Sequence, residues 1–207
     1  MGWEVKTLTI GIPSIDMMFT DTALCLNAAC IYTLQQQKQI VAIVNKKGSI
    51  VHQARCALVE DAIQNGSTHL LFLDSDHTFP KDTFLRLLDV DKDIVGLHQV
   101  TKRPPVRSNC EDMGGRRLLK AGTGVEEVSR IGTGIMLVRT EIFKKLKKPY
   151  FSFGYDDKKG WTGEDYWFCK HAKERGFRIY VDHDLSNECY HLGQASYGVA
   201  ELERKDL

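Results

Sequence analysis

The sequence predicts an α/β fold in which a mostly parallel central sheet is flanked by helices. Short apolar runs alternate with segments of helical spacing, and this alternation is typical of parallel sheets. The runs QIVAIVN and HLLFL are apolar almost throughout, as expected of strands that are covered on both faces. A chain of 207 residues fits one domain with a full hydrophobic core. We therefore expect a single domain over residues 1–207.

The expected elements follow one another along most of the chain. Strands are expected over residues 7–12, 39–45, 69–73, 93–97, 131–138 and 177–181. Helices are expected over residues 21–37, 50–64, 80–88, 140–146 and 163–175. Residues 101–130 lack periodicity and contain Pro104-Pro105 and Gly114-Gly115, so we expect loops and one short hairpin there.

The overall composition is that of an ordinary soluble protein. A formal net charge of +1 argues against a strongly cationic nucleic-acid-binding protein. The six cysteines form no C-x-x-C pair, so a disulfide framework is not expected. The beginning of the chain has no signal-peptide pattern, and no apolar stretch is long enough to span a bilayer. We therefore expect a cytoplasmic protein.

Two carboxylates stand where a central strand is expected to end. In LLFLDSDHTFP, four apolar residues lead directly to Asp74, Ser75 and Asp76. Open parallel sheets bind their ligands at the carboxyl ends of their strands. Two carboxylates at this spacing can hold a divalent cation, which can neutralise a diphosphate leaving group. The alternative is that both residues only end the strand and begin a turn.

The same residues also fit a second enzyme class. The pattern D-x-D-x-T, formed by Asp74, Asp76 and Thr78, resembles the first motif of haloacid-dehalogenase-type phosphatases. Asp74 would then be the nucleophile, with Asp182 and Asp184 as metal partners. In that family the motif usually opens the domain, whereas two strand–helix units precede it here.

Further candidate residues occur late in the chain. In TGEDYWF, Glu164 and Asp165 fall in the first turn of an expected helix, where acids suit both helix capping and catalysis. In ECYHLG, Cys189 and His191 point to the same side if the segment is extended. His191 could complete a metal site, either with the acidic triplet or in a zinc site with Cys189 and His183.

Six sequence segments, spread over nearly the whole chain, together resemble one known class of enzymes. They are TIGIPSI, the helix with Gln53 and Arg55, LDSDHTFP with its D-x-D motif, IGTGIMLVR, TGEDYWFCKHAKERGFRIYVD and YHLG. In this order they resemble the GT-A class of nucleotide-sugar-dependent glycosyltransferases, especially family-2-like enzymes and small phage or bacterial relatives. The resemblance implies a GT-A, Rossmann-like fold. It implies a nucleotide-binding half over residues 1–100 and an acceptor and catalytic half over residues 101–207.

The resemblance also implies roles for particular residues. Asp74, Asp76 and His191 would bind the metal, either Mn²⁺ or Mg²⁺. Asp165 would be the catalytic base, and Glu164 would hold acceptor or donor hydroxyls. The donor and its nucleotide would contact Pro13, Ser14, Asp16, Arg55, Asp74 and Ser75.

Two further groups have a place in this scheme. Gly132 and Gly134 would let the backbone approach the sugar closely, although a tight strand bulge would also account for them. Lys102 or Arg103 would join Arg55 in offsetting charge on the departing diphosphate, or would lie in a solvated loop.

The expected function is therefore transfer of a sugar from a nucleoside diphosphate sugar, first of all a UDP-sugar, to an acceptor hydroxyl. With Asp165 opposite the leaving group, the transfer would invert the anomeric centre. No acceptor module is evident, which leaves the acceptor open between a glycan and modified DNA. The alternatives are the phosphatase, a metal-dependent nucleotidyltransferase and a non-catalytic nucleotide-sugar binder.

Overall fold

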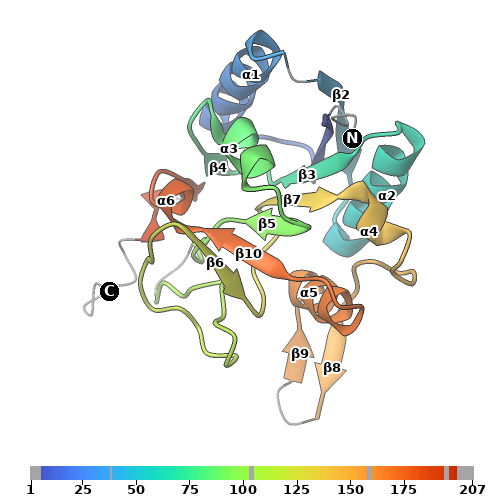
Figure 1. Ribbon diagram of the computed structural model, residues 1–207. Helices are drawn as coiled ribbons and strands as arrows, with labels where there is room; N and C mark the ends of the chain where they lie inside the picture. Colours follow the sequence, from blue (N-terminus) through green and yellow to red (C-terminus); the bar gives the residue numbers. More distant parts are fainter. Residues whose placement is uncertain (1–5, 38, 103–104, 158–159, 194–195, 200–207) are drawn as a thin grey trace.

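A seven-stranded sheet forms the centre of the protein (Figure 1). The computed structural model describes residues 6–37, 39–102, 105–157, 160–193 and 196–199. In order across the sheet, the strands are β2 (Gln39–Lys47), β1 (Thr7–Ser14), β3 (His69–Leu73), β7 (Ile135–Arg139), β5 (Ile94–Gly96), β10 (Ile179–Asp182) and β6 (Val125–Val128). β7 and β6 run antiparallel to their neighbours, whereas the other strands share one direction. The mostly parallel α/β sheet that the sequence predicts is therefore confirmed.

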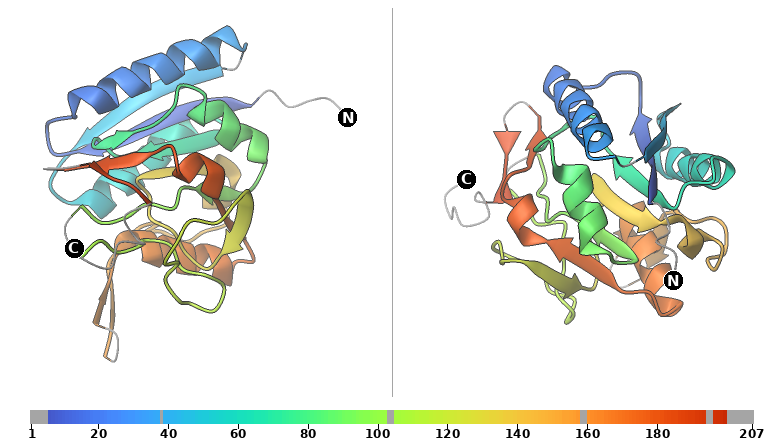
Figure 2. Two further views of the ribbon diagram at one scale, coloured as in Figure 1. Left: turned by 90° about the vertical axis from the view of Figure 1, so that its left-hand side faces the viewer. Right: turned by 45° about the horizontal axis from the view of Figure 1, so that its top comes forward.

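Helices cover both faces of this sheet (Figure 2). They are α1 (Thr20–Gln35), α2 (Val51–Gln64), α3 (Thr83–Val90), α4 (Thr140–Phe143), α5 (Glu164–Glu174) and α6 (His183–Ser186). One hydrophobic cluster includes Leu58 of α2, Phe143 of α4 and Phe168 of α5. A second cluster includes Ala29 of α1 and Leu87 of α3. Among the described residues, no helix has both the length and the apolar character needed to cross a bilayer.

The central strand β3 shows how this packing positions the residues that follow it. Leu70 and Phe72 belong to the first cluster, whereas Leu71 and Leu73 belong to the second. Burying each of these side chains stabilises the fold by about 1.5–3 kcal/mol. β3 also pairs with β1 on one side and with β7 on the other. The residues after Leu73 are therefore carried by a strand that is held on every side.

Some elements differ from the sequence-based expectation. β7 is antiparallel to both of its neighbours, because a pattern of apolar residues does not record the direction of a strand. β6 lies in the segment expected as loops, at the edge of the sheet beside β10. Its sequence VEEV fully buries only Val128, so it lacks the apolar run of a central strand.

Two small sheets accompany the large one. Their strands are β4 (His77–Thr78), β8 (Gly154–Asp156), β9 (Gly160–Thr162), β11 (Tyr190–Leu192) and β12 (Ser196–Tyr197). β12, β11 and β4 form one of these sheets, and β8 and β9 form a hairpin that projects from the body of the protein in Figure 1. These strands are too short to show a periodic pattern in the sequence.

Candidate active site

The connections after β1, β2 and β3 meet at one edge of the large sheet. The N–H of Phe19 donates to the carbonyl of Ser75 at 2.9 Å, which ties the loop after β1 to the loop after β3. The N–H of Gly48 donates to the carbonyl of Ser14 at 3.0 Å, which ties the end of β2 to the end of β1. Because the three strands are parallel, this is their common carboxyl edge, where sheets of this kind bind ligands.

The residues expected in the nucleoside pocket lie at this edge. Pro13 and Ser14 end β1, and Ser14 Oγ accepts a hydrogen bond from Asn45 Nδ2 at 2.8 Å. Asp16 lies in the following loop, where its exposed carboxylate is 2.5 Å from Lys47 Nζ. The three residues therefore lie near the end of β2, and their contact with a nucleoside stays a prediction.

Asp74 faces the buried side chain of Arg55. Arg55 Nη2 donates to both carboxylate oxygens of Asp74, at 2.9 and 3.1 Å, and Arg55 Nη1 lies 3.3 Å from Glu164 Oε1. Only 4% of Arg55 is exposed, and a buried guanidinium needs such counter-charges. Both oxygens of Asp74 thus face Arg55, and Asp74 is not among the residues whose potential ligand atoms gather around Asp76. The contact of Arg55 with the nucleotide stays a prediction.

The charges around Arg55 act on one another. Burial disfavours the charged guanidinium, but Asp74, Glu164 and Asp165 outweigh it and raise the pKa of Arg55. Burial and the charge of Glu164 raise the pKa of Asp165 to about 6, although Arg55 opposes the shift. Asp165 Oδ1 also accepts the N–H of Tyr166 at 2.7 Å, in the first turn of α5. A carboxyl group with this pKa can accept a proton near neutral pH, as a general base must.

Asp76 and His191 come together, and His77 joins them. Asp76 Oδ1 lies 3.5 Å from His191 Nε2 and 3.2 Å from His77 Nδ1. One potential ligand atom from each of the three residues lies within 4.8 Å of the others. Two of the three residues expected to bind the metal therefore lie together, with His77 beside them, while the role of Asp74 in metal binding stays a prediction. The sequence signal for His77 was its position directly after Asp76.

The small sheet of β4 and β11 positions the two histidines. His77 and His191 are paired residues of these antiparallel strands, and their rings stack with centroids 4.3 Å apart. The N–H of Leu192 donates to the carbonyl of Asp76 at 2.7 Å. His191 Nδ1 lies 2.8 Å from the carbonyl oxygen of Val100. Because a carbonyl oxygen only accepts, Nδ1 is the donor of this contact, and Nε2 is the ring nitrogen that lies toward Asp76.

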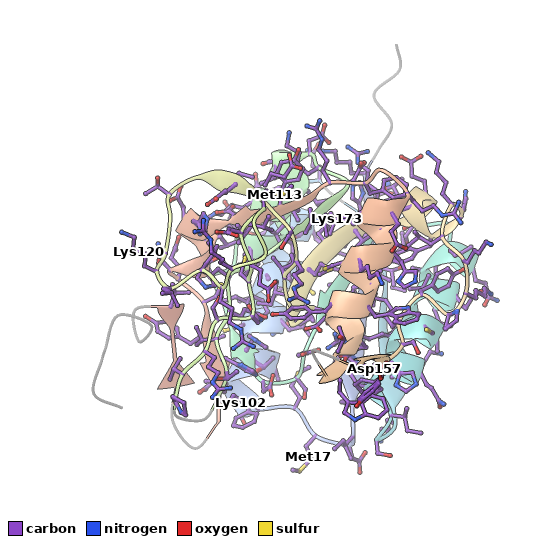
Figure 3. The ribbon with its side chains drawn as sticks, turned by 90° about the horizontal axis from the view of Figure 1, so that it is seen from below. Met17, Lys102, Met113, Lys120, Asp157 and Lys173 are labelled. Carbon is purple, nitrogen blue, oxygen red and sulfur yellow. The ribbon has the colours of Figure 1, made fainter. Side chains whose placement is uncertain are left out.

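Lys102 holds the second oxygen of Asp76. Its ammonium pairs with Asp76 Oδ2, which leaves Oδ1 facing the histidines. Burial alone would raise the pKa of Asp76, but the contacts with His191, His77 and Lys102 outweigh it and hold the pKa far below its usual value. Asp76 is therefore a carboxylate at neutral pH. Figure 3 shows Lys102 near the lower margin of that view, and Arg103 lies outside the described residues.

The polar atoms of this group fit a divalent cation. Asp76 Oδ1 and both ring nitrogens of His77 are buried, and within the described ranges they have no hydrogen-bond partner. Leaving such an atom unpaired costs about 1–3 kcal/mol. His191 Nε2 faces the same carboxylate oxygen, an arrangement that a proton or a cation between the two atoms stabilises. Carboxylate oxygens and imidazole nitrogens are both ligands of divalent metals.

Gly132 and Gly134 make room for side chains of the protein itself. A Cβ at Gly132 would lie 2.3 Å from Asn109 Nδ2. A Cβ at Gly134 would lie 2.5 Å from Gln99 Oε1 and 2.7 Å from His77 Cε1. These distances are shorter than any ordinary van der Waals contact, so a side chain at either position would displace these neighbours. The approach of this backbone to a sugar stays a prediction.

The alternative zinc site is not assembled. Cys189 is 6% exposed and packs in the second hydrophobic cluster. His183 Nε2 lies 2.9 Å from Oε2 of Glu126, a residue of the edge strand β6. Neither residue therefore joins His191.

The alternative phosphatase site is not assembled either. Asp182 Oδ1 accepts the N–H of Leu185 at 2.9 Å and so caps α6, and Asp184 Oδ1 accepts the N–H of Gly124 at 3.0 Å. β10, which ends at Asp182, is three strand positions from β3, or roughly 14 Å. Both oxygens of Asp74 are also bonded by Arg55, which leaves this carboxylate poorly placed to act as a nucleophile.

Comparisons with known proteins show what this architecture shares with others. No protein-family model and no curated protein matches the chain. Among solved structures, it is similar to A197 from STIV, with a TM-score of 0.63 and 18% identity over 95% of this chain and 91% of that chain. It is also similar to S. aureus TarS 1-349 in complex with UDP, with a TM-score of 0.47 and 14% identity over 86% of this chain and 58% of that chain. The chain thus shares with A197 its fold, a helix-flanked and mostly parallel sheet of the Rossmann-like, GT-A kind.

Proposed function

We propose that this protein is a metal-dependent glycosyltransferase that moves a sugar from a nucleoside diphosphate sugar to an acceptor hydroxyl. The observation that carries the proposal is the meeting of Asp76 and His191 at the carboxyl edge of β3, beside the Arg55–Asp74 pair. This edge combines a cation site with a carboxyl group of raised pKa, Asp165. The first donors to test are UDP-sugars.

The donor would lie across the ends of β1 and β3. Asp76 and His191 would hold Mn²⁺ or Mg²⁺, with the geometry described above. When bound, such an ion neutralises the charge that develops on a departing diphosphate. Ser75, between the two aspartates, would contact the donor. The nucleoside would lie against Pro13, Ser14 and Asp16.

Asp165 would remove the proton from the acceptor hydroxyl. Asp74 would act on the donor indirectly, because it holds Arg55, and Arg55 also contacts Glu164 at the start of α5. This chain of contacts fixes the first turn of α5 relative to the end of β3. It would thereby fix the base relative to the donor, a geometry on which the rate depends strongly. A base on the sugar face opposite the diphosphate would give inversion.

The acceptor would approach along the outer side of α5. A cavity of about 630 Å³ lies there, lined by Tyr166, Trp167 and Arg130 among other residues. Its volume and its mixture of aromatic and polar groups are typical of small-molecule sites. It reaches Tyr166 in the first turn of α5, the residue that follows the proposed base in the sequence. Glycans and modified DNA are the two acceptor classes to test.

The activity is tested with the full chain, a panel of UDP-sugars and both acceptor classes, first with Mn²⁺ or Mg²⁺ and then with a chelator. We expect metal-dependent release of UDP and transfer of the sugar. Asp165→Asn is expected to bind the donor normally and to lose transfer, because an amide cannot accept the proton.

Other outcomes would replace the proposal. Phosphate release from a phosphomonoester would favour the phosphatase, and pyrophosphate release from a nucleoside triphosphate would favour a nucleotidyltransferase. Tight donor binding without any turnover would favour a nucleotide-sugar binder.

A further inference from the structure

We propose that His77 is a third protein ligand of the metal, and that the resulting set of one oxygen and two nitrogens selects a transition-metal ion over Mg²⁺. The inference rests on the proposed function only in taking the Asp76–His191 edge as a cation site. It adds a third protein ligand to the proposed site. It also favours Mn²⁺ and other divalent transition metals over Mg²⁺.

The spacing of the donor atoms is that of ligands sharing one ion. Metal–ligand bonds of about 2.0–2.2 Å that meet at angles between octahedral and tetrahedral values place two ligand atoms roughly 2.8–3.6 Å apart. Asp76 Oδ1 lies 3.2 Å from His77 Nδ1 and 3.5 Å from His191 Nε2. Both separations fall in this range, so one ion can bind all three residues once the two stacked imidazole rings turn until both nitrogens point at it.

The surroundings of His77 support a ligand role. The residue is 1% exposed, and within the described part of the chain neither ring nitrogen makes a well-directed hydrogen bond, Nδ1 having only Asp76 Oδ1 nearby, at 3.2 Å. A histidine kept only for packing would normally satisfy at least one nitrogen, because unpaired buried polar atoms are costly. A bond from Nδ1 to a cation would remove one of these two deficits.

The backbone holds His77 at this place. β4 pairs His77 directly with His191 of β11, and the stacked rings present a nitrogen each to the same oxygen of Asp76. On the other side, the ring lies against Gly134, where a Cβ would come within 2.7 Å of His77 Cε1. Strand pairing and the absence of a side chain at Gly134 therefore fix the ring beside Asp76.

The ligand set decides which ions bind well. Mg²⁺ prefers oxygen ligands in near-ideal octahedral geometry and loses its water reluctantly. Imidazole nitrogens instead favour transition metals, and affinity rises from Mn²⁺ through Fe²⁺ to Co²⁺. With two nitrogens and one oxygen, we expect Co²⁺ to bind more tightly than Mn²⁺, and Mn²⁺ more tightly than Mg²⁺.

The test measures metal binding alone, without donor or acceptor. The metal-stripped full chain is titrated with Co²⁺, Mn²⁺ and Mg²⁺ by calorimetry, and bound Co²⁺ is also followed by its visible absorption. His77→Gln is expected to weaken Co²⁺ binding by at least about tenfold, since loss of even an outer partner of a ligand has this effect. Mg²⁺ binding should change much less, so the preference for Co²⁺ should shrink. His171→Gln is the matched control, because its ring stacks on Trp167 of α5.

A second variant guards against misfolding of the first. Gly134→Ala keeps His77 but displaces its ring, and it should weaken Co²⁺ binding in the same direction. Unchanged Co²⁺ affinity in a folded His77→Gln, or in Gly134→Ala if the first does not fold, would overturn the assignment of His77. Equal affinity of the wild type for Co²⁺ and Mg²⁺ would overturn the selectivity. Sugar transfer is measured separately, so a chain that binds Co²⁺ through His77 but transfers no sugar would refute the proposed function alone.

Discussion

Arg55 donates two hydrogen bonds to Asp74 through a single nitrogen, at 2.9 and 3.1 Å, while its other terminal nitrogen lies 3.3 Å from Glu164. One buried cation thus connects the end of β3 to the start of α5. Asp165 lies close enough to contribute to the same electrostatic balance. The guanidinium of Arg55 is therefore the shared counter-charge of three carboxyl groups, those of Asp74, Glu164 and Asp165.

Replacing Arg55 should destabilise the protein strongly. Arg55→Met keeps much of the side-chain volume but leaves Asp74 and Glu164 without their counter-ion, which typically costs about 3–5 kcal/mol. The free energy of unfolding in urea measures the loss. Lys47→Met is the control, because its pair with Asp16 is exposed and should contribute less than about 1 kcal/mol. Equal stability of the two variants would mean that the Arg55 contacts do not hold β3 and α5 together.

Sugar transfer should depend on pH through Asp165. A general base must be deprotonated, and the pKa of Asp165 is about 6. The rate should therefore rise as the pH increases through about 6 and level off above it. A pH–rate profile of transfer under saturating donor checks this limb. A rate that is flat between pH 5 and 8, with chemistry rate-limiting, would remove Asp165 from the base role.

The same shift predicts an effect on stability. Because the pKa of Asp165 is about 6 in the folded protein and 3.8 ordinarily, the folded state binds this proton more tightly than the unfolded chain. The contribution of Asp165 to stability is therefore present at low pH and is lost as the pH rises from about 4 to about 6. The Asp165→Asn variant does not lose this stability, because an amide does not titrate in this pH range. Its stability relative to the wild type should increase over that range by an amount on the order of 2 kcal/mol, as urea unfolding at several pH values would reveal.

The sequence was sufficient for the parts of the site that follow regular elements. The run HLLFL predicts a strand buried on both faces, and the structure divides its side chains between both hydrophobic clusters. The position of Asp76 at the end of that strand follows directly. No local pattern predicts that His191 lies at this edge of the sheet. That prediction depended on the fold that the family resemblance implies.

Other parts of the site depend on tertiary contacts that have no local signal. Arg55 follows Ala54 on α2, and the sequence does not show that its guanidinium turns inward to Asp74. His77 lies in the two-residue strand β4, which is too short for a periodic pattern. Its partner in the small sheet, His191, is distant in the sequence. The place of His77 beside Asp76 and His191 therefore emerged only from the folded structure.

Lys102 should weaken metal binding. Its ammonium pairs with Asp76 Oδ2, so a divalent ion at Oδ1 would lie near a fixed positive charge. At a separation of about 5 Å, the repulsion between a divalent ion and the ammonium amounts to about 1–2 kcal/mol when it is screened as in water. Lys102→Met should therefore increase the affinity for Mn²⁺ on the order of tenfold. Calorimetric titration measures the change, with Lys120→Met, an exposed lysine of another loop, as the control. Weaker binding in Lys102→Met would show instead that the ammonium holds Asp76 in its ligand position.

His191 and Cys189 should respond differently to replacement, although they are only two residues apart. His191→Ala removes a nitrogen that faces Asp76 and should weaken Mn²⁺ binding at least about tenfold. Cys189→Ala removes a buried sulfur that packs among apolar side chains, and burial raises the pKa of its thiol, which keeps the group neutral. This variant should lose roughly 1 kcal/mol of stability and retain its metal affinity. Titration with Mn²⁺ and with Zn²⁺, together with urea unfolding, separates the two effects. If Cys189→Ala lost Zn²⁺ binding while His191→Ala kept Mn²⁺ binding, the cation site would have to be rebuilt around the cysteine.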